Sequence, residues 1–396
     1  MIKREEYMSQ IRPFINQNIV KVLTGIRRCG KSVMLELIQG ELIEKGIAAE
    51  RLLSINFESN AVPYVKSVEE TYQFIRGFAT GNTGKCYLFL DEIQELEGWE
   101  KMINSCMIDF DVDIYITGSN AKLLSGELAT YLGGRYVEFH IYPFSFREVR
   151  ESEPDANEGE LFRRYLVRGG MPFLYQFPMD ERNVRQYLTD IYDSIVLKDI
   201  ITRHKIRDVE QFKRLLLYFI SNIGNTFSAL SIIKYMKSEY RGISNETLYN
   251  FIDFCKEACL LHLVPRQDLA GKSLLQFQEK IYLTDHGIRE AIYGNNIRDI
   301  SQVLENIVYM ELLRRGYQVS VGRNHSLEVD FVAEMGSARE YYQVAYLVAD
   351  EQTAQREFGA FQGIDDNYPK YVLSLDELDL SRKGYQHINL REFLLA

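Results

Sequence analysis

Eight consecutive residues, from Gly25 to Ser32, constrain the fold of this chain more than any other segment. They read Gly-Ile-Arg-Arg-Cys-Gly-Lys-Ser and match the pattern G-x-x-x-x-G-K-[S/T] in full. An apolar run precedes them at residues 19–25, and residues 32–45 follow with helical apolar spacing. The glycines let consecutive N–H groups turn toward an anion, and the helix adds the positive end of its dipole. A strand, this turn and a helix together predict a phosphate-binding loop on an α/β sheet.

This loop predicts most of a nucleotide site. Lys31 would reach the β- and γ-phosphates of ATP, and Ser32 would ligate Mg²⁺. The alternative is a glycine turn with a surface lysine, which the flanking strand and helix disfavour. The residues expected to contact ATP are Gly25, Arg27, Arg28, Cys29, Gly30, Lys31, Ser32 and Val33.

A second strand end supplies two carboxylates. Residues 85–92 are apolar from Tyr87 to Leu90 and end in Asp91 and Glu92. Asp91 would hold Mg²⁺ through water, and Glu92 would polarise the attacking water as a general base. We expect both acids to face the loop from an adjacent strand; a solvated strand end is the alternative.

Two further segments offer catalytic groups. A strand at 111–118 ends in small polar residues, and we take Asn120 as the catalytic candidate, although Thr117 and Ser119 fit equally well. Arg135 follows two glycines and could act as an arginine finger on the ATP of a neighbouring subunit, which would require a homo-oligomer. The alternative is a surface arginine in a salt bridge, and the pattern does not decide whether a finger would act in cis or in trans.

The order of the predicted elements indicates the fold class. Strands alternate with helices through the first part of the chain, which predicts a parallel sheet with helices on both faces. The strands are expected at 19–25, 51–58, 85–92, 111–118 and 135–141. A polar stretch at 151–160 breaks this pattern. The predicted domains are an AAA-like P-loop ATPase domain at 1–155, a helical region at 156–225, a winged-helix domain at 226–297 and a small α/β nuclease-like domain at 298–396.

Composition gives expectations about the partners of the chain, the redox state of its cysteines and its compartment. The net charge of −10 means that any DNA contact must be local. The five cysteines include no C-x-x-C pair, so we expect reduced thiols. The polar N-terminus does not resemble a signal peptide, and no apolar run approaches the ~20 residues that span a bilayer. We expect a cytoplasmic protein without a membrane partner.

The motifs together resemble a known family. GIRRCGKS, YLFLDEIQ, ITGSNAKLLS, LGGRY and YPFSFREV occur in that order, followed by RGGMP, KIYLTDHGI and LEVDFVAE. This combination resembles bacterial and archaeal AAA-type ATPases that carry a C-terminal domain of unknown function. The resemblance covers nearly the whole chain. It implies an ATPase core, a winged-helix region and a nuclease-like fold, and it supports Arg135 as a finger by analogy.

The predicted winged helix could contact DNA or protein. A helix is expected at 228–238, and a second helix follows an N-cap at Ser244 or Asn245 and carries apolar residues from Leu248 to Cys259 on one face. Two strands joined through residues 270–272 come next, with Lys272 near the wing tip. The exposed face of the second helix would carry polar and acidic groups, namely Asn245, Glu246, Tyr249, Asn250 and Asp253. Phosphate binding normally needs clustered Lys or Arg. A protein contact is therefore at least as well favoured as DNA.

The C-terminal segment carries part of a nuclease pattern. Glu305 on a helix and Asp330 on a strand could be its first two acids. Gln343 stands where the second strand acid belongs, and Ala345 stands where a lysine belongs. Such a site should bind metal poorly and cleave little.

The sequence therefore predicts a Mg²⁺-dependent ATPase that acts as a molecular switch on an unidentified target. A DNA-binding regulator with nucleotide as ligand is the alternative, and a metal-dependent nuclease is the third hypothesis.

Overall fold

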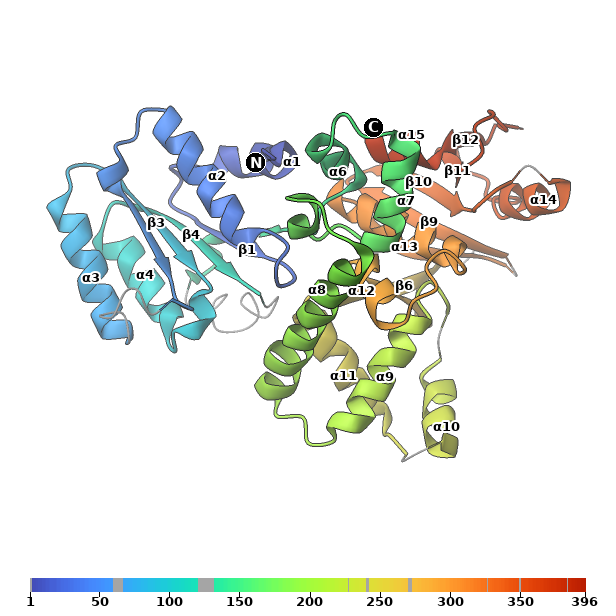
Figure 1. The fold of residues 1–396 in the computed structure, drawn as a ribbon, viewed down its shortest axis with the longest axis horizontal. Helices are drawn as coiled ribbons and strands as arrows, with labels where there is room; N and C mark the ends of the chain where they lie inside the picture. Colours follow the sequence, from blue (N-terminus) through green and yellow to red (C-terminus); the bar gives the residue numbers. More distant parts are fainter. Residues whose placement is uncertain are drawn as a thin grey trace. The chain divides into compact units, whose positions relative to one another are not determined.

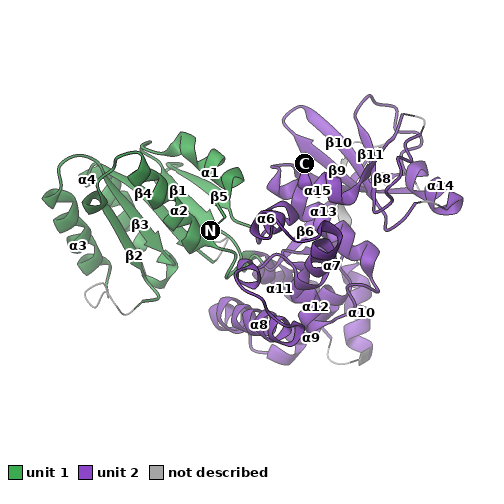
Figure 2. Cartoon of the chain, turned by 45° about the horizontal axis from the view of Figure 1, so that its top comes forward, with its two compact units in different colours: residues 1–142, 257–259 green, residues 143–256, 260–396 purple. Residues whose placement is uncertain are grey.

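The structure, a computed structural model, divides the chain into two compact units (Figure 2). One unit comprises residues 1–142 with 257–259, and the other comprises residues 143–256 with 260–396. The boundary expected at residue 155 therefore lies inside the second unit. The described residues are 2–59, 67–119, 132–226, 228–239, 242–269, 273–325, 327–348, 350–382 and 384–396.

The first unit contains the strands and helices expected around the phosphate loop (Figure 1). All five predicted strands are confirmed within one or two residues at each end. The elements are α1 (Glu5–Ile11), β1 (Val20–Thr24), α2 (Lys31–Glu44), β2 (Leu52–Asn56), α3 (Val68–Gly81), β3 (Cys86–Asp91), α4 (Trp99–Asp109), β4 (Val112–Gly118) and β5 (Tyr136–His140).

These five strands form a parallel sheet in the order β2-β3-β4-β1-β5. Alternate residues such as Val22, Leu88 and Ile114 form one core with α3 and α4. Phe89 and Tyr115 stack on the opposite face, with ring centroids 4.9 Å apart. Helices on both faces keep the sheet away from water, which explains its nearly unbroken apolar strands.

One expectation about this sheet is wrong. The strand that ends in the two acids, β3, does not neighbour the loop-bearing strand β1, because β4 lies between them. The connection through α2 carries the chain from β1 past two strand positions to β2, and the later strands then fill the gap. The spacing of motifs along a chain does not encode such a crossover.

The second unit begins with helices and continues into a sheet flanked by helices (Figure 1). A π-helical segment, Ile195–Thr202, continues directly from α8. None of the helices in the described ranges is both long and apolar enough to cross a membrane. The elements are α6 (Phe146–Ser152), α7 (Glu158–Arg168), α8 (Glu181–Ser194), α9 (Val209–Ser221), α10 (Ala229–Glu239), α11 (Asn245–Glu257), β6 (Leu261–Asp268), β7 (Ser273–Leu283), α12 (His286–Ile292), α13 (Ile300–Arg314), β8 (Gln318–Asn324), β9 (Leu327–Met335), β10 (Ala338–Val344), α14 (Glu351–Gly359), β11 (Lys370–Ser374), β12 (Gln386–Asn389) and α15 (Leu390–Leu395).

The two strands expected for the wing, β6 and β7, belong to the same sheet as the C-terminal strands. The order is β12-β11-β10-β9-β8-β6-β7, and β6 pairs with β8 in parallel. The expected boundary at residue 297 therefore does not separate two sheets, and the subdivision of this unit stays a prediction. The wing-tip residues 270–272, including Lys272, lie outside the described residues.

A close backbone contact explains two of the sequence motifs in this unit. Asp285 accepts a hydrogen bond from the N–H of Gly170 (2.7 Å) and caps α12. A Cβ at Gly169 would lie 2.1 Å from a carboxylate oxygen of Asp285, and one at Gly287 would lie 2.2 Å from the carbonyl oxygen of Arg168. Only glycine permits this approach, so the segments RGGMP and TDHG form one structural joint.

Candidate nucleotide site

The loop between β1 and α2 has a backbone that requires its glycines. Gly25 has φ 144°, and a Cβ there would lie 2.1 Å from the carbonyl oxygen of Ile141. Gly30 has φ 102° and is the N-cap of α2. Both conformations are costly for residues with a side chain. The loop therefore turns sharply into the N-terminus of a helix, the arrangement that favours a bound phosphate.

Lys31 is buried inside this loop. Its side-chain ammonium donates to the carbonyl oxygens of Gly25 (3.0 Å) and Ile26 (3.3 Å). The carboxylate that pairs with this ammonium is that of Glu92, whose Oε1 lies 3.8 Å from Nζ of Lys31. Lys31 is only 4% exposed. The ammonium is thus held mostly by neutral carbonyl dipoles, which leaves positive charge available to an anion.

Ser32 and Asp91 meet across the sheet edge. Oγ of Ser32 donates to Oδ2 of Asp91 at 2.8 Å, and the amide of Asn56 donates to the same oxygen at 2.9 Å. Thr117 donates to the other carboxylate oxygen. A hydroxyl beside a carboxylate is an all-oxygen donor pair, which is what Mg²⁺ prefers. The chemistry of these residues therefore fits Mg²⁺.

Glu92 lies next to the loop lysine in an uncommon conformation. Its φ is 52°, in the left-handed region, and its N–H donates to Oγ1 of Thr117 at 2.9 Å. The amide of Gln94 donates to Oε2 of Glu92. Thr117 thus connects both acids, because it donates to Asp91 and accepts from Glu92. The intervening strand β4 thus connects the carboxylate of Asp91 with the backbone of Glu92.

The three polar candidates at the end of β4 differ in their surroundings. The Thr117 hydroxyl donates to Asp91 and accepts from the N–H of Glu92. Ser119 is fully buried, and no group of the described chain bonds to its hydroxyl. Asn120 lies outside the described residues. Of the two described candidates, Ser119 is the one whose hydroxyl has no hydrogen-bond partner within the described chain.

The remaining predicted contact residues lie along the loop. Arg27 pairs with Glu58 at 3.2 Å, whereas Arg28 is exposed and has φ 68°. Cys29 is buried, and this burial raises the pKa of its thiol, so it stays protonated. Val33 is half-buried in the first turn of α2. The loop therefore exposes cationic and backbone groups rather than a reactive thiolate.

Arg135 lies at the opposite end of the strands. It directly precedes β5, and its carbonyl accepts from the N–H of Val20, where β1 begins. The phosphate loop follows the other end of β1. Five residues of strand separate the two ends by about 16 Å. The guanidinium donates to Oδ1 of Asn104 on α4 at 2.7 Å. Within one chain, Arg135 and the phosphate loop are therefore not brought together.

Sequence reasoning missed two residues that support this site. Asn56 closes β2 in register with Asp91 and binds it. A polar residue at the end of an apolar strand, as in the LLSIN segment, was the available signal. Arg4 donates to the carbonyl oxygens of Cys29 (3.0 Å) and Tyr142 (2.7 Å), and nothing in the local sequence marks that long-range contact.

A buried imidazole reports the electrostatics beside the loop. His140 ends β5, and its Nδ1 lies 3.1 Å from Oγ1 of Thr24, the last residue of β1. Burial, together with the positive charge of Lys31, lowers the pKa of His140 to about 4. The ring is therefore neutral at pH 7. The shift indicates that the region around Lys31 disfavours additional positive charge.

Comparison with known proteins places this geometry in a family. The chain is 37% identical over 378 residues to an uncharacterized protein of Haemophilus influenzae, which covers 94% of this chain and 93% of that relative. The chain belongs to the family of this Haemophilus protein. A second uncharacterized protein, from Methanocaldococcus jannaschii, is 27% identical over 390 residues, with 94% of this chain and 85% of the relative covered.

Family profiles and a solved structure agree with the first unit's fold. Residues 17–150 match the profile of the AAA domain, and residues 159–299 match a domain of unknown function (DUF8612). The solved structure of the Walker-type ATPase PABY2304 of Pyrococcus abyssi is similar, with a TM-score of 0.52 and 15% sequence identity. The match covers 74% of this chain and 96% of that protein. The family thus combines an AAA-type nucleotide-binding fold with a second part of unassigned role.

Proposed function

We propose that this protein is a Mg²⁺-dependent ATPase that acts as a molecular switch. The observation that supports it best is the connected set of Lys31, Ser32, Asp91, Glu92 and Thr117. A phosphate-binding loop, an oxygen donor pair for Mg²⁺ and a candidate general base lie within hydrogen-bonding or ion-pairing distance of one another. ATP hydrolysis needs these three functions in one place.

Each group has a defined part in the proposed reaction. The loop amides and the ammonium of Lys31 would hold the β- and γ-phosphates of ATP. Mg²⁺ held by Ser32 and Asp91 would neutralise charge on the same phosphates. Glu92 would accept a proton from water as the water oxygen attacks the γ-phosphorus. The bond from that phosphorus to the bridging oxygen breaks, and ADP and phosphate leave.

The ion pair between Lys31 and Glu92 supports a switch. Glu92 Oε1 lies 3.8 Å from the ammonium of Lys31. A γ-phosphate would compete for that ammonium, and Glu92 would then be free to orient water. Because Glu92 is bound through its N–H to Thr117, the change would pass to the end of β4. A two-state strand end of this kind can report nucleotide occupancy to a partner.

Arg135 fits the proposal only as a finger in trans. Its position at the opposite end of β1 and β5 keeps it from the loop of its own chain. A second copy could place Arg135 against the phosphates of the first and stabilise the transition-state charge. We therefore propose that the active form is a homo-oligomer.

Phosphate release by the full-length chain tests the ATPase proposal. We expect Lys31→Ala and Glu92→Gln each to lower kcat by roughly 10²-fold or more, because each removes a group acting on the transferred phosphoryl. Lys45→Ala on the same helix is a matched control, since that lysine side chain is 54% exposed and lies at the far end of α2. Equal rates for wild type, Lys31→Ala and Glu92→Gln would remove the proposal.

Mixing experiments test the finger. Arg135→Ala chains keep an intact loop, and Lys31→Ala chains keep an intact arginine. We expect each variant alone to be inactive and their mixture to regain phosphate release, because hybrid assemblies contain complete sites. A full-rate Arg135→Ala variant would exclude the finger, and an inactive mixture of variants shown to co-assemble would exclude its action in trans.

A further inference from the structure

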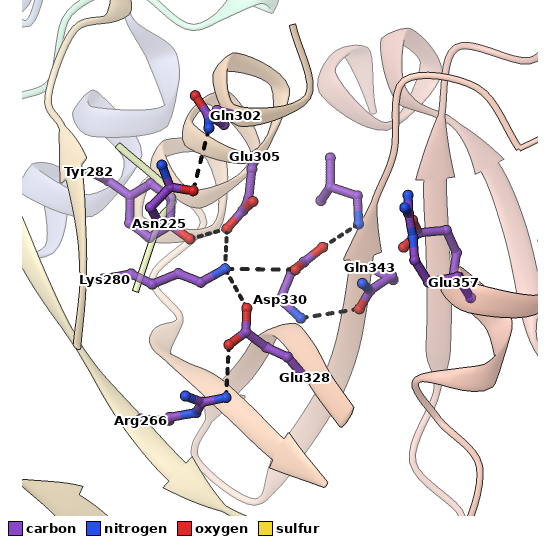
Figure 3. A network of polar contacts seen from close by, with 12 residues as sticks. Asn225, Arg266, Lys280, Tyr282, Gln302, Glu305, Glu328, Asp330, Gln343 and Glu357 are labelled. Carbon is purple, nitrogen blue, oxygen red and sulfur yellow. Dashed lines mark hydrogen bonds and ion pairs between the residues drawn. The ribbon is translucent and has the colours of Figure 1, made fainter. Parts of the chain in front are cut away.

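A buried lysine in the second unit lies at the centre of three carboxylates (Figure 3). The ammonium of Lys280, on β7, is 2.7 Å from Oε1 of Glu305 and 2.8 Å from Oε1 of Glu328. Oδ1 of Asp330 lies at 3.9 Å. Lys280 is 3% exposed. These carboxylates come from α13 and β9, so a single ammonium connects three elements that are distant in sequence.

Each acid around this ammonium also binds another hydrogen-bond donor. Tyr282 donates a hydrogen bond to Glu305, and Arg266 pairs with the second oxygen of Glu328 at 2.8 Å. Oδ2 of Asp330 accepts from the N–H of Val344 at 2.9 Å. Each acid thus has a second donor beside Lys280, which gives the cluster a fixed geometry rather than a mobile set of surface charges.

The charges in the cluster nearly cancel. Burial alone would lower the pKa of Lys280, but the three acids more than offset this effect and raise it. Burial and the neighbouring Glu305 raise the pKa of Asp330 well above its usual range, which favours its protonated form. Two cationic side chains, Lys280 and Arg266, therefore already contact the acids Glu305 and Glu328.

Two positions at which a nuclease would carry an acid and a lysine, residues 343 and 345, have other side chains in this protein. Gln343 uses its side-chain oxygen to accept the N–H of Asp330 at 3.2 Å. Ala345 is buried in an apolar cluster with Val332 and Phe361. The acids Glu305 and Asp330, expected from the sequence to share a site, therefore converge on Lys280, a lysine that the sequence pattern did not connect with them.

We propose that Lys280 is the resident cation of this carboxylate site and occupies the position that a divalent metal would otherwise take. Its ammonium lies where oxygen atoms of Glu305, Glu328 and Asp330 converge. A metal would have to displace a covalently attached charge from a buried cluster. The second unit would therefore carry out no metal-dependent cleavage at these acids, and Lys280 would hold β7, β9 and α13 together.

Binding of Mn²⁺ to the nucleotide-free full-length chain tests this proposal. Electron paramagnetic resonance measures free Mn²⁺, so a titration counts the metal bound. We expect wild type to show no Mn²⁺ binding that depends on Glu305 or Asp330. Lys280→Ala removes the ammonium and leaves repelling carboxylates, so it should gain one Mn²⁺ site that wild type lacks. Adding Glu305→Gln to this variant should abolish the gain.

Asp91→Asn, titrated in parallel, separates any Mn²⁺ held at the nucleotide site. Mn²⁺ bound by wild type and lost in Asp330→Asn would overturn the proposal, as would a folded Lys280→Ala variant that binds no more Mn²⁺ than wild type. If Lys280→Ala is unfolded without metal, circular dichroism with added Mn²⁺ decides. Recovery of the fold by Lys280→Ala but not by Lys280→Ala/Glu305→Gln supports the proposal, and no recovery contradicts it.

Discussion

Both units bury a lysine beside acidic residues, but the two lysines are held in opposite ways. Lys31 is bound by two backbone carbonyls, with the Glu92 carboxylate 3.8 Å away. Lys280 has two carboxylates within 2.8 Å and a third at 3.9 Å. Neutral dipoles stabilise a cation without cancelling its charge, whereas carboxylates cancel it. The first lysine can therefore accept an anion, and the second cannot.

The acids of the two sites follow the same rule in reverse. Asp91 is bound by neutral donors from Ser32, Asn56 and Thr117. Glu328, in contrast, is bound by two cationic side chains, Lys280 and Arg266. A carboxylate satisfied by hydroxyls and amides keeps its charge for Mg²⁺, whereas one paired with ammonium and guanidinium does not. Both sites contain lysine and acidic residues. The difference is that the charges at the nucleotide site are not cancelled by neighbouring charges, whereas those around Lys280 are.

Replacing each lysine by methionine should separate stability from function. Lys280→Met should lower the free energy of unfolding by about 3–5 kcal/mol, because it leaves buried carboxylates without their cation. Lys31→Met should change it by less than about 1 kcal/mol, since a weakly paired buried charge is replaced by an apolar chain of similar length. Urea unfolding followed by circular dichroism measures both values.

The two methionine variants should rank in the opposite order when the rate of phosphate release is measured. Lys31→Met should lower the rate, whereas Lys280→Met, assayed at a temperature where it is folded, should keep the wild-type rate. Equal losses of unfolding free energy in the two variants would contradict this contrast. The ammonium of Lys31 would then be stabilised by its neighbours as strongly as the ammonium of Lys280.

The hydroxyl of Thr117 provides a smaller test of the neutral-donor rule. Thr117→Val preserves shape but removes the donor to Asp91 and leaves the N–H of Glu92 without its acceptor. We expect a loss of about 1–3 kcal/mol in unfolding free energy and a reduced rate of phosphate release. Thr80→Val, on the exposed side of α3, is the matched control and should have little effect. An unchanged rate would show that Thr117 does not position the acids.

Much of the first unit could be predicted from local sequence. Apolar runs located its five strands, and the glycine-framed turn located the loop, because strand burial and tight turns leave local signatures. Strand order could not be predicted in this way, so β4 and its Thr117 were not expected between the loop and the acids. The partners of Asp91 depend on which strands are neighbours, and that is a property of the whole sheet.

The second unit shows a different limit. Glu305 and Asp330 were identified as a pair, and the structure brings both to one ammonium. Lys280 itself stood in an ordinary strand pattern, LLQFQEKIYLT, that suggested only a wing. Its role arises because β7 belongs to the same sheet as β9, and Lys280 reaches the acids on β9 and α13. A contact across separate predicted domains leaves no local signal.

The smallest expected effect concerns His140, which lies close enough to Lys31 to sense its charge. Burial and that charge lower the pKa of His140 to about 4, whereas the unfolded chain takes up the proton near pH 6.5. Stability linked to the neutral ring is therefore fully present above pH 6.5 and is lost as the pH falls toward 4. His140→Gln should flatten this part of the pH profile of unfolding.

The imidazole also measures whether the charge of Lys31 is left uncompensated. Lys31→Met removes the positive charge, so the pKa of His140, followed by its ring-proton chemical shift in nuclear magnetic resonance, should rise toward its ordinary value. Bound nucleotide should raise the pKa in the same direction in wild type, because phosphate would cancel the ammonium. Lys45→Met serves as the control, since that lysine is exposed and paired with Glu41. If Lys31→Met left the pKa of His140 unchanged, burial alone would explain the shift, and the loop could no longer be described as a site with surplus positive charge.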